Sequence, residues 1–467
     1  MNGKQLLAEL DGPAAAALFT KLYGPQGAVY GRDRYASLIQ GMLTDGEGGF
    51  PRTDFPETAG DLRLFTAPGR TELGGNHTDH NQGRVLAASI QLDQAAVAAP
   101  RADLRIFFRS TGFPDVMVDL AGPGGGLDLA PRESEKGATA ALIRGVAAEF
   151  SARGTAVRGF TVNADSTVLP GSGLSSSAAV EVLFGRIIDN LFSGGGHDFL
   201  EIARVGQRAE NRYFGKPCGL MDQTACACGG AVGIDFADPG KPAVKRVEVD
   251  LAAGGYALCV VNTGGSHADL TPDYAAIPAE MKAVAAFFGK GALRECDEGA
   301  VKAGAPEIRR KLGDRALLRA LHFFAENRRA AEMLAALEAF HAPPPGNGGE
   351  PEAARKARQD ALARYLNLVN ESGDSSWELL QNVYSPRNPE DQGISTALAL
   401  TRDFLDAETG GAAGACRVHG GGFAGTIQSY IPLPLLERYR TLMDGLFGPG
   451  SVTPLMIRPL GAEELIL

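Results

Sequence analysis

The sequence predicts a soluble protein of mixed class, α/β or α+β, with about two domains. With 467 residues the chain is too long for one ordinary hydrophobic core. Some stretches repeat apolar residues at helical spacing, whereas others are short apolar runs interrupted by Gly, Pro, Asn and Asp, a pattern typical of strands and loops. The two patterns alternate along the chain, which indicates a fold that mixes helices with sheet.

Composition narrows the class of partner. Hydrophobic residues make up 44% of the chain and charged residues 21%, as in ordinary globular enzymes. A formal net charge of -10 argues against nucleic acid as a partner, because binding its phosphates requires a basic face. The first residues, MNGKQLLAELDG, lack the features of a secretory signal, and no apolar run reaches membrane-spanning length. We therefore expect a cytoplasmic protein, with no membrane partner and with reduced cysteines, that acts on small molecules.

Residues 1–61 are predicted to be largely helical, because apolar side chains recur at helical spacing at Leu6, Leu7, Leu10, Leu18, Phe19 and Leu22. From Leu62 onward strands are expected, notably over residues 85–99 and 159–168. The stretch HAPPPGNGGEPEAARKARQ, residues 341–359, is predicted to be a surface loop between helices, since proline and glycine sustain neither a helix nor a ladder. The glycine clusters near Gly122 and Gly194 are also predicted to be loops.

The stretch LPGSGLSSSAAVEVLFGRIIDNLF, which begins at Leu169, indicates an anion site. Its second half places apolar residues on one helical face, at Val180, Leu183, Phe184, Ile187, Ile188 and Leu191. Gly171, Gly173 and three serines precede that helix, whose first amides have no intrahelical partner and attract negative charge. The alternative is that Ser175 simply caps the helix. No Lys stands where a Walker A loop requires one, so a nucleotide kinase built on this loop is not of the P-loop type.

Two acids follow in a helical and glycine-rich context. Glu210 lies in the helical stretch ARVGQRAENRYFG, which Gly215 is predicted to end. Asp222 comes after Gly219 in KPCGLMDQ, where it fits a general base, a metal ligand or a helix cap. Farther on, residues 420–425 match the spacing of a dinucleotide fingerprint. We reject that match, because residues 426–431 read as a strand and too little chain remains for a βαβ unit.

Several ordered motifs resemble those of the galactokinases, which share a superfamily with homoserine, mevalonate and phosphomevalonate kinases. PGRTELGGNHTDHNQG is similar to the galactokinase signature, LPGSGLSSSAAVEV to the superfamily's phosphate loop and RVHGGGFAGT to its C-terminal glycine motif. CGLMDQ, NTGGSHADLTPDY and RALHFFAENRRAAEMLAAL extend the resemblance from about Leu62 to Pro432. It implies an α+β fold of two lobes, with the active site in the cleft between them. A helical extension, residues 1–61, would pack on a ribosomal-S5-like lobe, residues 62–255, followed by a ferredoxin-like lobe, residues 256–467.

The resemblance implies ATP-dependent phosphorylation of galactose at its anomeric hydroxyl, with Mg²⁺. Asp222 would face that hydroxyl with Arg70 beside it, while Ser177 and Glu210 would hold the magnesium ion. The sugar would be bound by Asn76, His77, Asp79, Gly219 and Tyr274. The nucleotide phosphates would be bound by Gly171, Ser172, Gly173, Leu174, Ser175, Ser176 and Ser177. Oligomeric state is not encoded in these motifs, and a monomer is slightly favoured.

The signature also allows a metal reading, since His77, Asp79 and His80 offer three ligand types. A strand would point His80 away from the other two, which argues against one shared zinc ion.

The signature departs from the family pattern at four positions. Asn76 replaces the glutamate expected to contact the sugar's C6 hydroxyl, and His80 replaces a tyrosine. Glu72 stands where the family has asparagine, and Gly74 where it has an aliphatic residue. Because Asn76 loses a charge-assisted bond, the alternatives are a kinase for a 2-amino or C6-modified relative of galactose, or a sensor that binds galactose and ATP without turnover. The sensor is disfavoured because Arg70, Ser177, Glu210 and Asp222 are all present.

Overall fold

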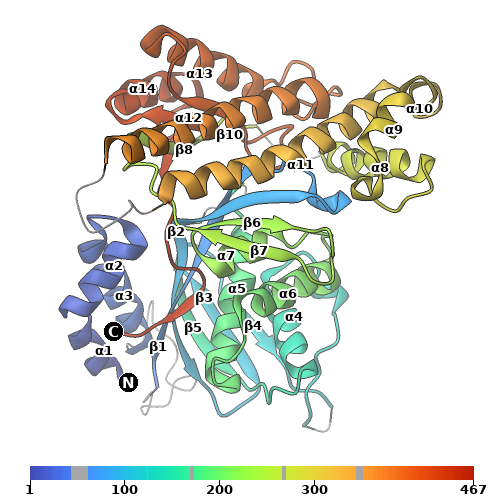
Figure 1. The fold of residues 1–467 in the computed structure, drawn as a ribbon. Coiled ribbons are helices and arrows are strands. Elements are labelled where there is room, and N and C mark those ends of the chain that lie inside the picture. Colours follow the sequence, from blue (N-terminus) through green and yellow to red (C-terminus); the bar gives the residue numbers. More distant parts are fainter. Residues whose placement is uncertain (44–60, 124, 169–172, 266–269, 343–350) are drawn as a thin grey trace.

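The computed structural model describes residues 1–43, 61–123, 125–168, 173–265, 270–342 and 351–467. Within these residues the strands form two sheets, one in the lower and one in the upper part of Figure 1. The arrangement confirms the α+β class.

The larger sheet has the strand order β12-β1-β2-β5-β3-β4, and β6 and β7 are attached along β2. The long β2 makes this possible, because residues 84–88 pair with β6 and residues 94–100 pair with β5. Its strands are β1 (Arg63–Gly74), β2 (Arg84–Pro100), β3 (Arg105–Ser110), β4 (Val116–Asp119), β5 (Phe160–Ser166), β6 (Ala231–Asp235), β7 (Ala243–Val247) and β12 (Glu463–Leu465). β1 and β2 are antiparallel, and the register shifts between Pro68 and Arg70 and again between Glu72 and Gly74.

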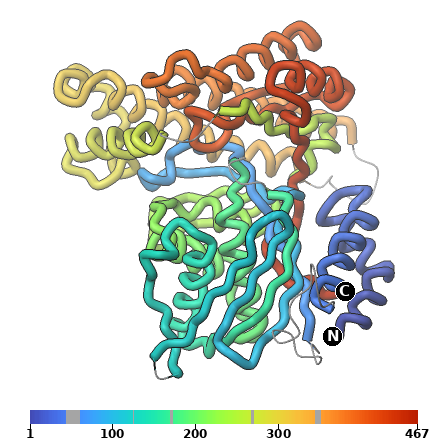
Figure 2. Tube along the Cα trace, turned by 180° about the vertical axis from the view of Figure 1, so that it is seen from behind, coloured from blue at the N-terminus to red at the C-terminus, as the bar shows by residue number. Residues whose placement is uncertain are grey.

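Helices cover both faces of this sheet. Phe65, Ala96 and Ala98 pack under α4 (Thr139–Ala152), α5 (Ser176–Ile188), α6 (Phe199–Ala209) and α7 (Met221–Cys228). Leu64, Ala95 and Val97 point to the opposite face, as the two-residue period of a strand requires, and pack with α1 (Gly3–Glu9), α2 (Pro13–Tyr23) and α3 (Gly27–Leu43). The two termini lie close together beside these helices (Figures 1 and 2).

A buried ion cluster fixes the N-terminal helices to the sheet. Asp93, on β2, is fully buried and pairs with Arg34 of α3 at 2.5 Å and with Arg458 at 3.0 Å. Thr66 of β1 donates a hydrogen bond of 2.5 Å to the same carboxylate, and Arg34 also pairs with Asp165 of β5 at 2.6 Å. The cluster joins α3, the three neighbouring strands β1, β2 and β5, and the segment before β12.

The second sheet has the order β11-β8-β10-β9 and is antiparallel throughout. It consists of β8 (Tyr256–Asn262), β9 (Ala415–Val418), β10 (Thr426–Pro432) and β11 (Val452–Leu455). α13 (Gly393–Thr409) and α14 (Leu436–Phe447) pack on one face. The other face shares a core with α11 (Asp314–His341), α12 (Glu352–Ser375) and residues of β1 and β2. α8 (Thr271–Phe287), α9 (Glu298–Ala303) and α10 (Ala305–Leu312) pack on the far part of α11 (Figure 1).

Short helical turns complete the chain. The 3-10 turns are η1 (Asp79–Asn81), η2 (Glu133–Glu135), η5 (Leu293–Glu295) and η7 (Leu433–Leu435), and the π turns are η3 (Asp189–Ser193), η4 (Glu210–Phe214) and η6 (Ser376–Leu380). Two of the π turns lie next to predicted site residues: η3 continues from α5, which carries Ser176 and Ser177, and η4, which continues from α6, begins at Glu210.

Most expected elements are confirmed, including the early helices, the strands over residues 85–99 and 159–168 and the helix that follows the serine triplet. The extent of the loop predicted for residues 341–359 is wrong. α11 runs to His341 and α12 begins at Glu352, because EAARKARQ consists of strong helix formers. Residues 343–350 lie outside the described residues. The lobe boundary at residue 255 stays a prediction; β12, late in the sequence, belongs to the first sheet.

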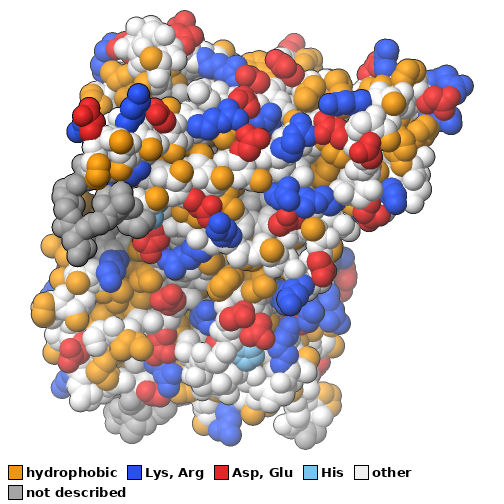
Figure 3. All heavy atoms as spheres, viewed as in Figure 1, with side chains coloured by type: hydrophobic (Ala, Val, Ile, Leu, Met, Phe, Trp, Pro, Cys, Tyr) orange, Lys and Arg blue, Asp and Glu red, His pale blue; other side chains and the backbone are white. Residues whose placement is uncertain are grey.

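The described helices include none that is both long and apolar enough to cross a membrane. On the face shown in Figure 3, acidic and basic side chains are interspersed rather than gathered into one large basic patch.

Candidate active site

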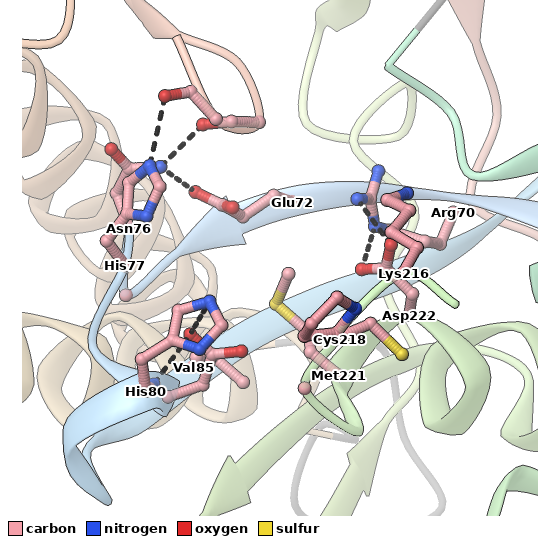
Figure 4. Close-up of a pocket in the computed structure, with 16 residues that line it drawn as sticks. Arg70, Glu72, Asn76, His77, His80, Val85, Lys216, Cys218, Met221 and Asp222 are labelled. Atoms are coloured by element: carbon pink, nitrogen blue, oxygen red, sulfur yellow. Dashed lines mark hydrogen bonds and ion pairs between the residues drawn. The ribbon is translucent and has the colours of Figure 1, made fainter. Parts of the chain in front are cut away.

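Two adjoining cavities of about 240 Å³ each lie where β1, α5 and α7 meet the glycine motif of residues 420–425. The first, which we call the signature cavity, is lined mainly by residues 70–80 and 216–222 (Figure 4). The second, the serine cavity, is lined by residues 173–177 together with His419, Ala424 and Thr426. Five residues line both cavities, namely Arg70, Lys216, Asp222, Gly420 and Gly421. These five mark the boundary at which molecules in the two cavities would meet.

Arg70 and Asp222 form an ion pair at this boundary. Arg70 comes from β1, and Asp222 from the first turn of α7. Arg70 Nε donates to Asp222 Oδ1 at 2.8 Å and Nη2 donates to Oδ2 at 3.0 Å. Burial alone would raise the pKa of Asp222, but Arg70 and then the hydroxyl of Ser175 outweigh it and hold that pKa below its ordinary value. The carboxylate is therefore ionised at neutral pH.

Ser175 holds the N-cap position of α5, but the structure corrects the capping alternative. Its φ is 59°, and its side chain makes no hydrogen bond to the first turn of the helix. Instead Ser175 Oγ donates to Asp222 Oδ2 at 2.5 Å. The first turn consequently has no side-chain cap from Ser175, and Ser175, Ser176 and Ser177 line the serine cavity. Gly171 and Ser172, also predicted to bind phosphate, lie outside the described residues.

Gly173 and Leu174 complete the approach to α5. Gly173 has a φ of 72°, and an added Cβ would lie 3.0 Å from Thr426 Oγ1. Arg70 Nη1 donates to the Gly173 carbonyl at 2.5 Å, and the Leu174 carbonyl accepts a bond from the amide of Arg70 at 3.0 Å. The loop before the helix is thus fixed to the same arginine that pairs with Asp222.

Ser177 and Glu210, which the resemblance implies as the magnesium ligands, lie next to each other. Ser177 Oγ donates to Glu210 Oε1 at 3.1 Å. Glu210 begins the π turn η4, which ends at Gly215 with a φ of 86° and so confirms the predicted end of this helix. Gln223 Nε2 donates to Glu210 Oε2 at 3.0 Å and to Glu181 Oε2 at 2.9 Å, and Lys216 Nζ lies 3.5 Å from Glu210 Oε1.

The Ser177 and Glu210 oxygens fit a hard cation such as Mg²⁺, which takes oxygen ligands and usually keeps several waters. A further carboxylate oxygen, Glu181 Oε1, is buried nearby without a hydrogen-bond partner. The described residues contain no group of three or more His, Cys, Asp or Glu side chains that could hold a metal ion. A cation bound here would therefore draw its remaining ligands from water or phosphate.

The signature loop is a turn rather than a strand, which corrects the geometry used against a shared metal. β1 ends at Gly74, His77 has a φ of 58°, and Asp79–Asn81 is the 3-10 turn η1. His77 Nε2 lies 3.0 Å from the Gly421 carbonyl, and burial lowers the pKa of His77 to about 4. His77 is thus a neutral side chain that joins the signature loop to the glycine motif.

Gly219 lies close to the Asp79 side chain of the signature loop. A Cβ at this position would lie 2.3 Å from Asp79 Oδ2, so a larger residue would require the Asp79 carboxylate to move. Both Asp79 and Gly219, which the resemblance implies as sugar-binding residues, line the signature cavity.

Asn76 is held from several sides. Its Nδ2 donates to Glu72 Oε1 at 2.9 Å and to the Gly420 carbonyl at 2.6 Å, while Asn382 Nδ2 donates to its Oδ1 at 2.9 Å. Its main-chain carbonyl lies 3.0 Å from His322 Nε2. Glu72 in turn accepts a bond of 2.7 Å from the buried Arg417. Figure 4 shows the Glu72 carboxylate directed toward Asn76 and away from the Arg70 and Asp222 pair.

Tyr274, the remaining sugar-binding prediction, lies on α8 against the glycine motif. Its hydroxyl donates to the Gly422 carbonyl at 2.8 Å, and its ring packs edge-on against Phe423. It is not among the residues that line the signature cavity. In this structure Tyr274 supports the wall formed by the glycine motif.

Sequence reasoning missed Lys216, Asn382 and Glu326. Lys216 lines both cavities, and nothing in GKPCG distinguishes it from a surface lysine. Asn382 contacts Asn76 although the two are far apart in the sequence, and no local pattern predicts such a contact. Glu326 had a usable signal, an acid four residues after His322 on a largely apolar helix. It is fully buried and accepts hydrogen bonds from the Gly75 amide at 2.9 Å and from Ser372 at 2.7 Å.

Two family models match the chain where these residues lie. Residues 53–100 match the galactokinase galactose-binding signature, and residues 141–230 match the GHMP kinases N terminal domain. A galactokinase of Streptomyces coelicolor is 35% identical over 279 residues, which is 59% of this chain and 69% of that protein. The chain belongs to the galactokinase family.

Solved structures agree on the fold of this galactokinase family member. The crystal structure of Lactococcus lactis galactokinase complexed with galactose has a TM-score of 0.67 at 23% identity, and the match covers 87% of this chain and 95% of that one. Methanococcus jannaschii mevalonate kinase has a TM-score of 0.53 at 11% identity, with 85% and 99% covered. These likenesses show the two-lobed α+β fold.

Proposed function

We propose that this protein transfers the γ-phosphoryl group of ATP to the anomeric hydroxyl of galactose, giving galactose 1-phosphate and ADP. The observation that carries the proposal is the position of Asp222. Its carboxylate, held by Arg70 and Ser175, lines both the signature cavity and the serine cavity. A sugar in the first cavity and a triphosphate in the second would therefore meet at this carboxylate.

Asp222 would orient the nucleophile. Phosphoryl transfer proceeds through a loose transition state, in which the bond to the leaving oxygen is largely broken before the new bond has formed. The lowered pKa of Asp222 suits this sequence. Its ionised carboxylate accepts a hydrogen bond from the anomeric hydroxyl and receives the proton only as the new oxygen–phosphorus bond forms. Early deprotonation of the sugar is not required.

The nucleotide phosphates would bind at the start of α5. The free amides of its first turn and the helix dipole favour negative charge there. Arg70 and Lys216 place two cations at the junction of the cavities, where charge moves from the γ-phosphoryl to the leaving oxygen. Mg²⁺ would be held by Ser177 and Glu210, and when bound it neutralises phosphate charge.

The test is a product assay resolved by mass. Purified protein with ATP and Mg²⁺ is offered galactose, 2-amino-2-deoxygalactose, 6-deoxygalactose and glucose, and the sugar phosphates formed are identified. Galactose 1-phosphate is the expected main product, and Asp222→Asn should abolish it. Preference for an amino or deoxy sugar would favour the C2- or C6-modified alternative. Tight galactose binding without any sugar phosphate would indicate a sensor.

The oligomeric state stays a prediction, with a monomer slightly favoured. Light scattering during size-exclusion chromatography measures the oligomeric state. The cytoplasmic location stays a prediction.

A further inference from the structure

We infer that Glu72 and Asn76 have exchanged roles in this protein, so that Glu72 supplies the carboxylate for a sugar hydroxyl far from the anomeric carbon. This inference deepens the proposed function and rests on it. The family resemblance predicts glutamate at position 76 and asparagine at position 72. The structure places the two side chains in direct contact, with Asn76 Nδ2 donating to Glu72 Oε1 at 2.9 Å.

The amide of Asn76 is committed to protein partners. Its two N–H groups are used by Glu72 and by the Gly420 carbonyl, and its oxygen accepts from Asn382. The residue is 1% exposed. An asparagine side chain has two donor hydrogens, so none is left for a ligand. Asn76 therefore holds the signature loop against the glycine motif and cannot donate to the sugar.

Glu72 keeps a carboxylate at the wall of the signature cavity. Arg70 and Glu72 are two residues apart on β1 and therefore lie on the same side of the strand. Arg70 pairs with Asp222 at one end of the signature cavity, and the Glu72 carboxylate points toward Asn76 at the other end (Figure 4). The hydrogen bonds that Asn76 and Arg417 donate to Glu72 both go to Oε1. Oε2 can accept a bond from a hydroxyl, and the side chain retains 5% exposure.

An acid at position 72 or at position 76 would balance the positive charge of Arg417. Arg417 is fully buried, and its Nε and Nη1 have no hydrogen-bond partner among the described residues. It therefore needs a nearby carboxylate. Because Glu72 Oε1 is shared by Arg417 and Asn76, moving the acid to position 76 keeps it one hydrogen bond away from Arg417. A two-residue exchange is thus compatible with the same surroundings.

The experiment compares Glu72→Asn, Asn76→Glu and the double variant, using galactose, 4-deoxygalactose and 6-deoxygalactose. Glu72→Asn should lower kcat/KM for galactose by roughly 10- to 100-fold, the loss expected for a hydrogen bond to a charged group. It should also reduce the preference for galactose over the deoxy sugar that lacks the contacted hydroxyl. Asn76→Glu alone sets two carboxylates side by side and should also lose activity. The double variant should recover to within about tenfold of wild type, as expected for directly coupled residues.

Glu326→Gln is the matched control. It changes a carboxylate to an amide in the same buried network but does not line the cavity. It should lower the thermal midpoint and leave the ratio of galactose to deoxygalactose kcat/KM unchanged. If Glu72→Asn does not fold, Glu72→Gln, which keeps the side-chain length, replaces it. Calorimetry of galactose binding to each folded variant supplies a readout independent of turnover.

Two results would overturn the inference. One is a Glu72 variant that lowers kcat/KM for all three sugars equally, which is the behaviour of a purely structural residue. The other is a folded double variant no more active than Glu72→Asn. Failure of the proposed function is separate, because it appears as wild-type protein that makes no galactose 1-phosphate, and the galactose-binding measurements then still decide the role of Glu72.

Discussion

Ser175 Oγ donates a hydrogen bond of 2.5 Å to Asp222 Oδ2 and thereby joins the start of α5 to the carboxylate at the boundary of both cavities. This contact stabilises the ionised form of Asp222 and contributes to its lowered pKa, after the larger effect of Arg70. Ser175→Ala should therefore raise the pKa of Asp222. The acid limb of the kcat/KM profile should move to higher pH, because Asp222 then becomes protonated earlier as pH falls. Ser176→Ala, which removes the neighbouring hydroxyl, should leave the position of that limb unchanged.

Asp222→Asn should lower kcat by at least about 10³-fold, since orientation and acceptance of the proton are both lost. Galactose binding measured by calorimetry should weaken far less than kcat falls. Arg70 would lose its charged partner in this variant, so the thermal midpoint must be measured alongside. A folded Asp222→Asn protein with wild-type turnover would remove this residue from the mechanism.

Ser177→Ala and Glu210→Gln should raise the Mg²⁺ concentration needed for half-maximal activity, roughly 10- to 100-fold for Glu210→Gln. Direct binding of Mn²⁺ in the presence of ATP, followed by electron paramagnetic resonance, gives a readout independent of catalysis. Glu201→Gln is the control, because Glu201 lies on α6, the helix that leads into the turn with Glu210, but is exposed and belongs to the capping box of α6. Equal metal requirements in all three variants and the wild type would show that the ion is held elsewhere.

Arg34→Met should destabilise the protein by about 3 kcal/mol, because it removes one of the two arginines that neutralise the fully buried Asp93. The change in free energy of unfolding is measured by urea denaturation. Arg32→Met is a close control, since Arg32 lies on the same helix with exposed partners, Asp11 and Asp33. Its unfolding midpoint should match wild type. If the two variants behave alike, the N-terminal helices are not fixed by the Asp93 cluster.

Glu326 should make stability depend on pH in the acid range. Burial would raise the pKa of Glu326, but Arg329, followed by His322 and Arg417, outweighs burial and holds it at about 2. A glutamate in the unfolded chain has a pKa of about 4.3. The stabilisation is therefore complete above that value and is lost as pH falls toward 2. Glu326→Gln should be less stable at neutral pH, with a flatter stability curve between these values, as measured by denaturation at a series of pH values.

Local patterns predicted the helix after Ser175, the end of the helical segment at Gly215 and the strand over residues 426–431, because these depend on periodicity and on single glycines. The pairing of Arg70 with Asp222 and of Ser177 with Glu210 followed from resemblance. Neither approach predicted the hydrogen bond from Ser175 to Asp222. A serine at this position can cap the helix or donate to a carboxylate from a distant part of the chain, and its sequence context does not distinguish the two. The partners of Asn76 come from segments that meet only in the folded chain.

The pairing of Leu64 with Leu465 places two distant parts of the sequence in neighbouring strands of one sheet. During synthesis β1 emerges long before β12. The edge of β1 that pairs with β12 therefore stays unpaired until nearly the whole chain has been translated. Unpaired backbone groups along that edge are a template for wrong pairing between nascent chains. The yield of native protein should therefore depend on chaperone supply and growth temperature more than on the stability of the finished fold.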